Sequence, residues 1–507
     1  MQWFKDLIYI IYPEVLVSIG LIVAIILSTT KYKSIIWTTS ILFLLTACTH
    51  IVKNLFPLTE EVQILSGMLV VDQLSIIFKA LILGLAILLI LGSIKYSDGF
   101  IHKSEFVIVL LTAILGSMFL ISSNDTITLF ISLETLGLSS IMLAGYSKYD
   151  SRSNEASLKY LLNSASASAI FLFGLSLLYG LTGQTQFQEI KYKLFQLSSH
   201  HELNHLTISL ILMLIIAGLG FKLASAPFHM WSPDVYEGSP TPATAFLSVI
   251  SKIAGIGITI RLLGTLFDFA HSTWQPMLII ISILSMVIGN FIALGEVLNK
   301  ASIKRLMAYS SIAQIGYILI GIALFTKETI AGSVFYLIIY SIMNLGAFLC
   351  IIAFGNESNS DSITDYSGLA KKKPLLALAF AICLLNLGGL PIPPAGFIAK
   401  FILFKVSFEA GSIGILLGTI ALITTILSIY YYSYIVKLMI VNNPSQVVLN
   451  MDTNKQSLGK SFELNSAITF AVIAIFLSFI VSYPLLKLSN KTISMLPENK
   501  NLISYKK

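Results

Sequence analysis

The sequence carries little charge for its length. Of its 507 residues, 11% are Asp, Glu, Lys or Arg and 56% are hydrophobic, whereas soluble domains carry about 25% charged residues. So few charges cannot cover a surface that faces water. The apolar runs reach the ~20 residues that a helix needs to cross a bilayer, and they do not alternate as barrel strands do. We therefore predict an all-α, multi-pass membrane protein.

Signatures of redox centres and nucleotide sites are also missing. Cys48, Cys350 and Cys383 lie scattered in apolar runs without C-x-x-C spacing, so we predict no iron–sulfur cluster, zinc site or disulfide. Neither a G-x-G-x-x-G after a strand nor a G-x-x-x-x-G-K-[ST] occurs. The H-E-x-x-H match at His201–His205 lies in a polar connection without a third ligand, and we interpret it as a solvated loop. We expect this chain to bind no cofactor, no metal and no nucleic acid.

Apolar runs predict about fourteen membrane helices. Their approximate limits are 8–28, 34–52, 66–92, 105–122, 125–146, 156–181, 206–226, 241–262, 276–296, 305–325, 329–354, 374–404, 412–438 and 464–486. Lys and Arg concentrate in the odd-numbered connections, which places these connections on the inner side. The net charge of +7 therefore suits an anionic lipid surface.

Several ionisable residues lie inside these spans. A lysine near the bilayer centre costs ~3 kcal/mol on insertion scales, so each is a functional hypothesis by default. Of the acids, we expect only Glu134 to lie deep in a span. For most of the lysines there is a structural alternative: an ion pair with Glu155 for Lys159, and snorkelling or an ion pair for the others. The five lysines within spans are Lys79, Lys159, Lys222, Lys252 and Lys400.

Two of these lysines lie beside prolines that interrupt a span. Pro227 follows Lys222 in span 7, and Pro391, Pro393 and Pro394 precede Lys400 in span 12. A broken helix at membrane depth is tolerated only beside protein or a water-lined cavity. The interruptions are five spans apart, and an odd offset means opposite orientation. This predicts two inverted five-helix repeats, a pattern that marks the working site of transporters.

Two further residues belong to this hypothesis. Gln314 stands near the place in the second repeat that Glu134 occupies in the first. His229 follows the interruption of span 7, and imidazole changes its charge near neutral pH. We interpret His229 either as a proton relay or as a structural hydrogen-bonding group at the freed backbone.

Long segments resemble a known family. They are "DSRSNEASLKYLL", "FHMWSPDVYEGSPTPATAFLSVISK", "KRLMAYSSIAQIGYILIG", "YSIMNLGAFLCIIAFG" and "DYSGLAKKKPLLALAFAICLLNLGGLP". They resemble the antiporter-like membrane-arm subunits of proton-pumping NADH–quinone oxidoreductase, respiratory complex I. Within that family, the resemblance is to the subunit N group, called subunit 2 or B in cyanobacteria and chloroplasts. It covers roughly residues 65–440.

The resemblance implies the same architecture and names site residues. It implies fourteen helices with helices 7 and 12 broken, here divided into 1–104, repeat 1 at 105–262, repeat 2 at 276–438 and a last helix at 464–486. The family's functional positions fall on Glu134, Lys159, Lys222, Lys252 and Lys400. A lysine in span 12 favours the subunit N group, since sister subunits tend to carry glutamate there. One departure is "GGLPIPPAGF", which is one residue longer than the usual motif and affects the geometry beside Lys400.

The resemblance also implies a function for the chain as part of a complex. Protons would move along Glu134, Lys159, Lys222, Lys252 and Lys400 through water chains, driven by quinone reduction elsewhere. NADH or ferredoxin, FMN, iron–sulfur clusters and quinone would be held by partner subunits, and other membrane-arm subunits and lipid would surround the chain. A prokaryotic plasma membrane is the favoured location, with thylakoid or inner organelle membranes as alternatives. The rival functions are a subunit of a multisubunit Na⁺/H⁺ antiporter, a non-pumping scaffold of the membrane arm and, less favoured, a solute permease.

Overall fold

The computed structural model describes residues 2–31, 33–56, 61–199, 204–451, 459 and 461–492, with side chains from residue 9 onward and without that of Ser199. The elements of the first half are α1 (Gln2–Ser28), η1 (Lys33–Ile35), α2 (Ile36–His50), η2 (Ile51–Leu55), β1 (Val62–Ile64), β2 (Leu69–Val71), α3 (Gln73–Ser93), η3 (Tyr96–Gly99), α4 (Lys103–Ser122), α5 (Thr126–Ala144), α6 (Ser151–Thr182), α7 (Phe187–Ser199), α8 (His205–Leu223), α9 (Trp231–Gly238), α10 (Thr241–Ser248), α11 (Ile250–Arg261) and η4 (Leu262–Leu266).

The second half continues in the same helical manner. Its elements are η5 (Asp268–Ala270), α12 (His271–Leu298), α13 (Ile303–Leu324), α14 (Lys327–Ser358), η6 (Ile363–Tyr366), α15 (Leu369–Lys372), α16 (Pro374–Gly388), α17 (Ala395–Glu409), α18 (Ser412–Ile440), α19 (Gln446–Leu449), α20 (Phe462–Ile480) and α21 (Ser482–Lys491).

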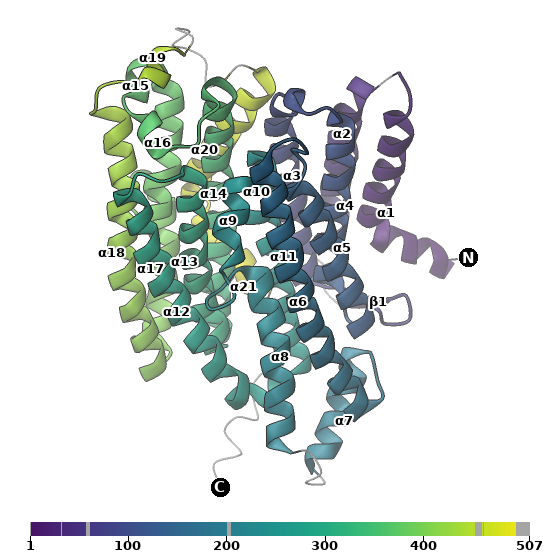
Figure 1. Ribbon diagram of the computed structural model, residues 1–507. Coiled ribbons are helices and arrows are strands. Elements are labelled where there is room, and N and C mark those ends of the chain that lie inside the picture. The colour runs from purple at the N-terminus through teal and green to yellow at the C-terminus, as the bar shows by residue number, and fades with distance from the viewer. Residues whose placement is uncertain are drawn as a thin grey trace.

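The long helices stand side by side in one bundle (Figure 1). Within the described residues, thirteen helical segments are long and apolar enough to cross a membrane. The remaining predicted span, 374–404, is divided into α16 and α17. The predicted all-α, multi-pass fold of about fourteen spans is confirmed.

The centre of the bundle is formed by the spans that contain α10 and α11, α13 and α14. Their apolar windows are 100%, 94% and 94% buried, against 22% for α6 and 33% for α20. The outer helices therefore present apolar side chains outward, to lipid or to other membrane subunits. Buried polar groups on the central helices are shielded from both.

Both predicted interruptions are present. In span 7, α8 ends at Leu223, Ala224 takes a left-handed conformation with φ of 54°, and α9 begins at Trp231. In span 12, α16 ends at Gly388, Gly389 has φ of 90°, and α17 begins at Ala395. The chain runs upward through α8 and α9 and downward through α16 and α17 (Figure 1), as inverted repeats require. The unit limits 105–262 and 276–438 stay a prediction.

The sequence-based limit was wrong at the start of span 3, and two further features were not expected. Residues 66–72, expected inside span 3, belong to an antiparallel hairpin in which Val62 pairs with Val71, and α3 starts only after the N-cap Asp72. Span 8 is also interrupted, because Val249 (φ −117°, ψ −71°) separates α10 from α11. The polar connection after span 6 contains helix α7. Strand β2 and Val249 are buried, so hydropathy alone did not distinguish them from the neighbouring helices.

Candidate functional site

The buried cations fall into two groups. In the part of the chain that the structure describes, Lys79, Arg261, Lys304 and Lys373 each form an ion pair with an acid. Lys222, Lys252 and Lys400 are only 5%, 1% and 3% exposed, and no acid among the described residues lies within ion-pair distance of any of them. A buried, unpaired ammonium is costly. These three lysines are therefore the candidates for side chains that change their protonation state.

Lys222 lies in the last turn of α8, two residues before the left-handed Ala224. Its Nζ is buried and makes no hydrogen bond. The carboxylate of Glu134 on α5 interacts with it electrostatically without a direct ion pair. Glu134 is half-buried and accepts a hydrogen bond from the Ser168 hydroxyl on α6. The acid and the lysine are thus neighbours, and the charge of each affects the protonation of the other.

Lys252 follows the interruption at Val249 by three residues and lies on α11. Its Nζ donates a hydrogen bond of 2.7 Å to the Ser311 hydroxyl on α13. A hydroxyl accepts from an ammonium and also from a neutral amine, so this contact suits both protonation states.

Lys400 lies in the second turn of α17, beside the interruption of span 12. Its Nζ donates to the Gly388 carbonyl at 3.1 Å, lies 3.5 Å from the Ser428 hydroxyl, and stands 5.0 Å from the centre of the Tyr317 ring. The Gly388 carbonyl is available because α16 ends at this residue. The longer motif "GGLPIPPAGF" therefore leaves Lys400 in contact with the interruption.

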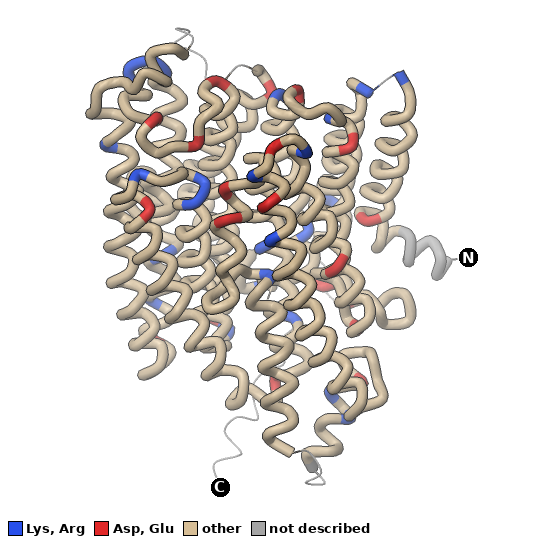
Figure 2. Tube along the Cα trace, viewed as in Figure 1, with Lys and Arg blue, Asp and Glu red and all other residues tan. Residues whose placement is uncertain are grey.

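Lys159 has a different environment from the other predicted lysines. Its side chain is 43% exposed and pairs with Glu155 at 2.7 Å and with Asp234 on α9 at 2.8 Å. The pair with Glu155 is the structural alternative that the sequence offered. Asp234, which the sequence analysis did not single out, also binds Arg305 on α13 at 2.8 Å. Figure 2 shows charges of both signs side by side where Figure 1 places α9.

His229 lies in the turn between α8 and α9. The residue is 5% exposed, and its Nδ1 is buried without a hydrogen-bond partner. Its backbone carbonyl accepts from the Ser232 amide at 2.9 Å. Its role as a proton relay or as a structural hydrogen-bonding group stays a prediction.

The sequence led us to expect that Glu134 is the only acid deep inside the bundle, and this was wrong. Glu14 on α1 is 3% exposed and pairs with Lys79 on α3. Lys79 therefore does not use Asp72, which instead binds Arg261 at 2.8 and 2.9 Å. Glu14 lies beside Pro13 in an otherwise apolar run, and that lone acid was the signal available for it.

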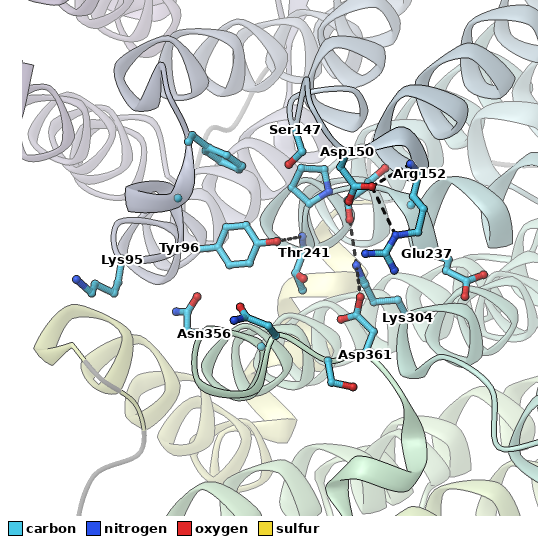
Figure 3. Close-up of a pocket in the computed structure, with 18 residues that line it drawn as sticks. Lys95, Tyr96, Ser147, Asp150, Arg152, Glu237, Thr241, Lys304, Asn356 and Asp361 are labelled. Carbon is cyan, nitrogen blue, oxygen red and sulfur yellow. Dashed lines mark hydrogen bonds and ion pairs between the residues drawn. The ribbon is translucent and has the colours of Figure 1, made fainter. Parts of the chain in front are cut away.

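A cavity of about 480 Å³ opens among the connections that the sequence places on the inner side. In Figure 3, Lys304 reaches across its floor toward Asp361. Lys304 Nζ pairs with Asp361 at 2.8 Å and donates to the Ser239 carbonyl at 3.2 Å. Thr241, also in the lining, begins α10.

A buried polar stripe leads from this cavity toward Lys252. Thr241, Thr244 and Ser248 follow at intervals of three and four residues, which places them on one helical face, and all three are buried. Lys252 comes four residues after Ser248, beyond the interruption at Val249.

The predicted solvated loop at the H-E-x-x-H match lies largely outside the described residues, because His201–Leu203 are not among them. Within the described part of the chain, no group of three or more His, Cys, Asp or Glu side chains is placed to hold a metal ion.

Comparison with known proteins decides the family. A family model described as "NADH:quinone oxidoreductase/Mrp antiporter, TM" matches residues 123–428, more than half of the chain. The chain belongs to this family. It is 44% identical over 431 residues to NAD(P)H-quinone oxidoreductase subunit 2 of Gloeothece citriformis, covering 84% of this chain and 82% of that protein. The same subunit of Synechocystis sp. is 45% identical over 427 residues, covering 83% and 80%.

Solved structures show the same architecture. A chain of respiratory complex I from Thermus thermophilus is 26% identical with a TM-score of 0.76, covering 94% of this chain and 99% of that one. A chain of the Mrp complex from Dietzia sp. is 21% identical with a TM-score of 0.82, covering 97% and 98%. At that identity, the Mrp likeness shows the fold alone. Both neighbours come from multisubunit membrane complexes.

Proposed function

We propose that this chain translocates protons as a membrane-arm subunit of a quinone oxidoreductase complex. One observation carries the proposal: three buried lysines without acid partners lie at three interruptions of membrane helices. Helix interruptions expose backbone polar groups that can hold water, and lysines at those points can take up and release a proton. The relatives named NAD(P)H-quinone oxidoreductase subunit 2 support the choice of complex.

In this proposal, Glu134 controls the charge of Lys222. A unit charge about 4 Å away contributes ~4 kcal/mol at an effective dielectric constant of 20. Moving one charge across 150 mV requires ~3.5 kcal/mol. The two energies are similar, so a movement that brings Glu134 to about 4 Å from Lys222, or takes it away again, can drive one proton. Lys252, in the first repeat, then passes the proton to Lys400 in the second.

The surrounding complex supplies the energy. We propose that partner subunits hold the NADH or ferredoxin site, FMN, iron–sulfur clusters and quinone, since this chain carries no sequence signature for them. Sister antiporter-like subunits and small membrane subunits would cover its apolar outer faces. The cyanobacterial relatives favour a thylakoid or plasma membrane.

Substitution of Lys400 in the assembled complex tests the proposal. Lys400→Met is expected to abolish most proton translocation by this subunit, measured as proton uptake per electron in sealed membrane vesicles. Lys405→Met is the matched control, because Lys405 lies on the same helix with its side chain 62% exposed. Lys222→Met is the second arm. Unchanged pumping in both buried-lysine variants would favour the non-pumping scaffold.

A role as an Na⁺/H⁺ antiporter subunit is the alternative, and its support is the fold shared with the Mrp chain. It predicts that proton movement depends on Na⁺ and persists without quinone reduction. The quinone oxidoreductase proposal predicts the opposite dependence in the same vesicles.

A further inference from the structure

Buried hydroxyl groups lie in the region between the side chains of Lys252 and Lys400. The proton path proposed above assigns no role to them. Lys252 on α11 and Lys400 on α17 bond to different partners, Ser311 on α13 and Ser428 on α18. These hydroxyls are the two ends of a gap that a proton must cross between the lysines. The question is which side chain lies between them.

Tyr432 on α18 has contacts at both ends of this gap. Its hydroxyl is hydrogen-bonded to the hydroxyl of Ser310, the residue next to Ser311. Tyr432 lies four residues after Ser428, so the two side chains lie one turn apart on the same helical face. Its ring lies against Gly388, where an added Cβ would be 3.5 Å from the Tyr432 ring. Gly388 is the residue whose carbonyl binds Lys400.

Two neighbouring tyrosines also have other partners, although Tyr431 interacts with Ser310 and Tyr432 as well. The Tyr431 hydroxyl donates to Asn290 on α12 at 3.2 Å. Tyr317 offers its ring to Lys400, while its hydroxyl donates to Thr424 at 3.2 Å. Tyr432 is itself fully buried, as are Ser310, Ser311 and Ser428 (at most 2% exposed). Bulk water therefore offers no parallel route at this point.

We propose that the Tyr432 hydroxyl carries protons between Lys252 and Lys400. The inference rests on the proposed proton translocation and names a new residue in it. In the transfer, the Lys252 ammonium loses a proton and the Lys400 amine gains one. Each hydroxyl between them breaks its own O–H bond toward the next acceptor and forms a new one from the preceding donor. One water molecule bridges Ser311 to Ser310 and another bridges Tyr432 to Ser428. Tyr432 is neutral before and after, and no electrons move.

The chain offers a matched pair of variants for the test. Tyr432→Phe and Tyr430→Phe each remove one hydroxyl from α18, the first from a buried tyrosine and the second from a tyrosine that is 52% exposed. In the assembled complex, we expect Tyr432→Phe to lose proton translocation as far as Lys400→Met does, with a raised solvent deuterium isotope effect on what remains. Tyr430→Phe should pump as the natural protein does. Tyr432→His, which restores a group that donates and accepts protons, should recover pumping.

A structural role for the hydroxyl makes a different prediction. Tyr432→Phe leaves the buried Ser310 hydroxyl without its partner, whereas Tyr432→Phe with Ser310→Ala removes both polar groups. Recovery of pumping in the double variant would overturn the proposal, and so would normal pumping in Tyr432→Phe. If Lys222→Met and Lys400→Met fail to pump while Tyr432→Phe succeeds, only this inference fails. If the lysine variants pump normally, the proposed function itself fails.

Discussion

Lys400 binds the carbonyl of Gly388, the last residue of α16, at 3.1 Å. The lysine on one half of span 12 is thus tied to the backbone end of the other half. Asn386 supports the same turn, because its Oδ1 accepts from the Gly396 amide at 3.1 Å. The geometry of the interruption therefore determines where the lysine lies.

The close approach at Gly396 gives a prediction. A Cβ at this position would lie 2.0 Å from the Asn386 carbonyl oxygen, a backbone atom that cannot move independently. Gly396→Ala is expected to destabilise the chain by about 1–3 kcal/mol and to reduce proton translocation by displacing Lys400. Gly295→Ala is the control, since nothing lies within 4 Å of its Cβ. Thermal stability of the purified complex and vesicle pumping would be measured for both, and equal behaviour would contradict the prediction.

The pair of Arg261 and Asp72 gives a second prediction. Arg261 binds both carboxylate oxygens of Asp72 and, through Nε, the Ile121 carbonyl at 2.9 Å. Removing one member of a buried pair typically costs about 3–5 kcal/mol. Arg261→Met should therefore lower the thermal stability of the complex strongly. Arg261→Met combined with Asp72→Leu should lower it less, and a double variant as unstable as the single one would contradict this.

The same pair predicts a pH dependence. Burial raises the pKa of the Asp72 carboxyl, but Arg261 and Ser75 more than offset this, and the net pKa is below its usual value. A depressed carboxyl pKa stabilises the fold above the unfolded value of ~3.9 and ceases to do so as the pH falls through the folded value. The deficit of Arg261→Met should therefore be largest near neutral pH and shrink below pH ~4. A deficit as large below pH ~4 as at neutral pH would argue against it.

Asp234 joins the two repeats and gives a further prediction. It binds Lys159 on α6 and Arg305 on α13, each at 2.8 Å, with its side chain 35% exposed. Partly exposed pairs contribute up to ~1 kcal/mol each, so Asp234→Asn should cost only about 1 kcal/mol. If the contact transmits movement between the repeats, Asp234→Asn should lower proton uptake per electron clearly while the thermal stability of the complex changes little. Asp150→Asn, on an exposed pair with Arg152, is the control for the loss of one acid.

The sequence predicted the fold well because hydropathy and interrupting prolines are local signals. Pro227 and the prolines before Lys400 marked two breaks correctly. The break at Val249 escaped detection because the chain has no proline between Pro242 and Lys252. Among the site residues, a charge in an apolar run identified Lys222, Lys252 and Lys400. Whether each lysine is paired depends on side chains from other helices. The ion pair between Lys159 and Asp234 joins α6 to α9 and therefore could not be predicted from the sequence.

The floor of the inner cavity gives the last prediction. Lys304 is 5% exposed, and its ammonium holds both Asp361 and the Ser239 carbonyl between α9 and α10. Asp361→Asn leaves a buried ammonium without its acid. The expected cost is roughly 2 kcal/mol, below the full value for a buried pair because the Asp361 side chain is 27% exposed. Water should then reach Thr241 more readily, measured as faster amide hydrogen exchange in α10 of the assembled complex. Exchange in α7, which lies at the opposite end of the bundle from α9 and α10 (Figure 1), is the internal reference, and unchanged α10 exchange would show that the pair does not close the cavity.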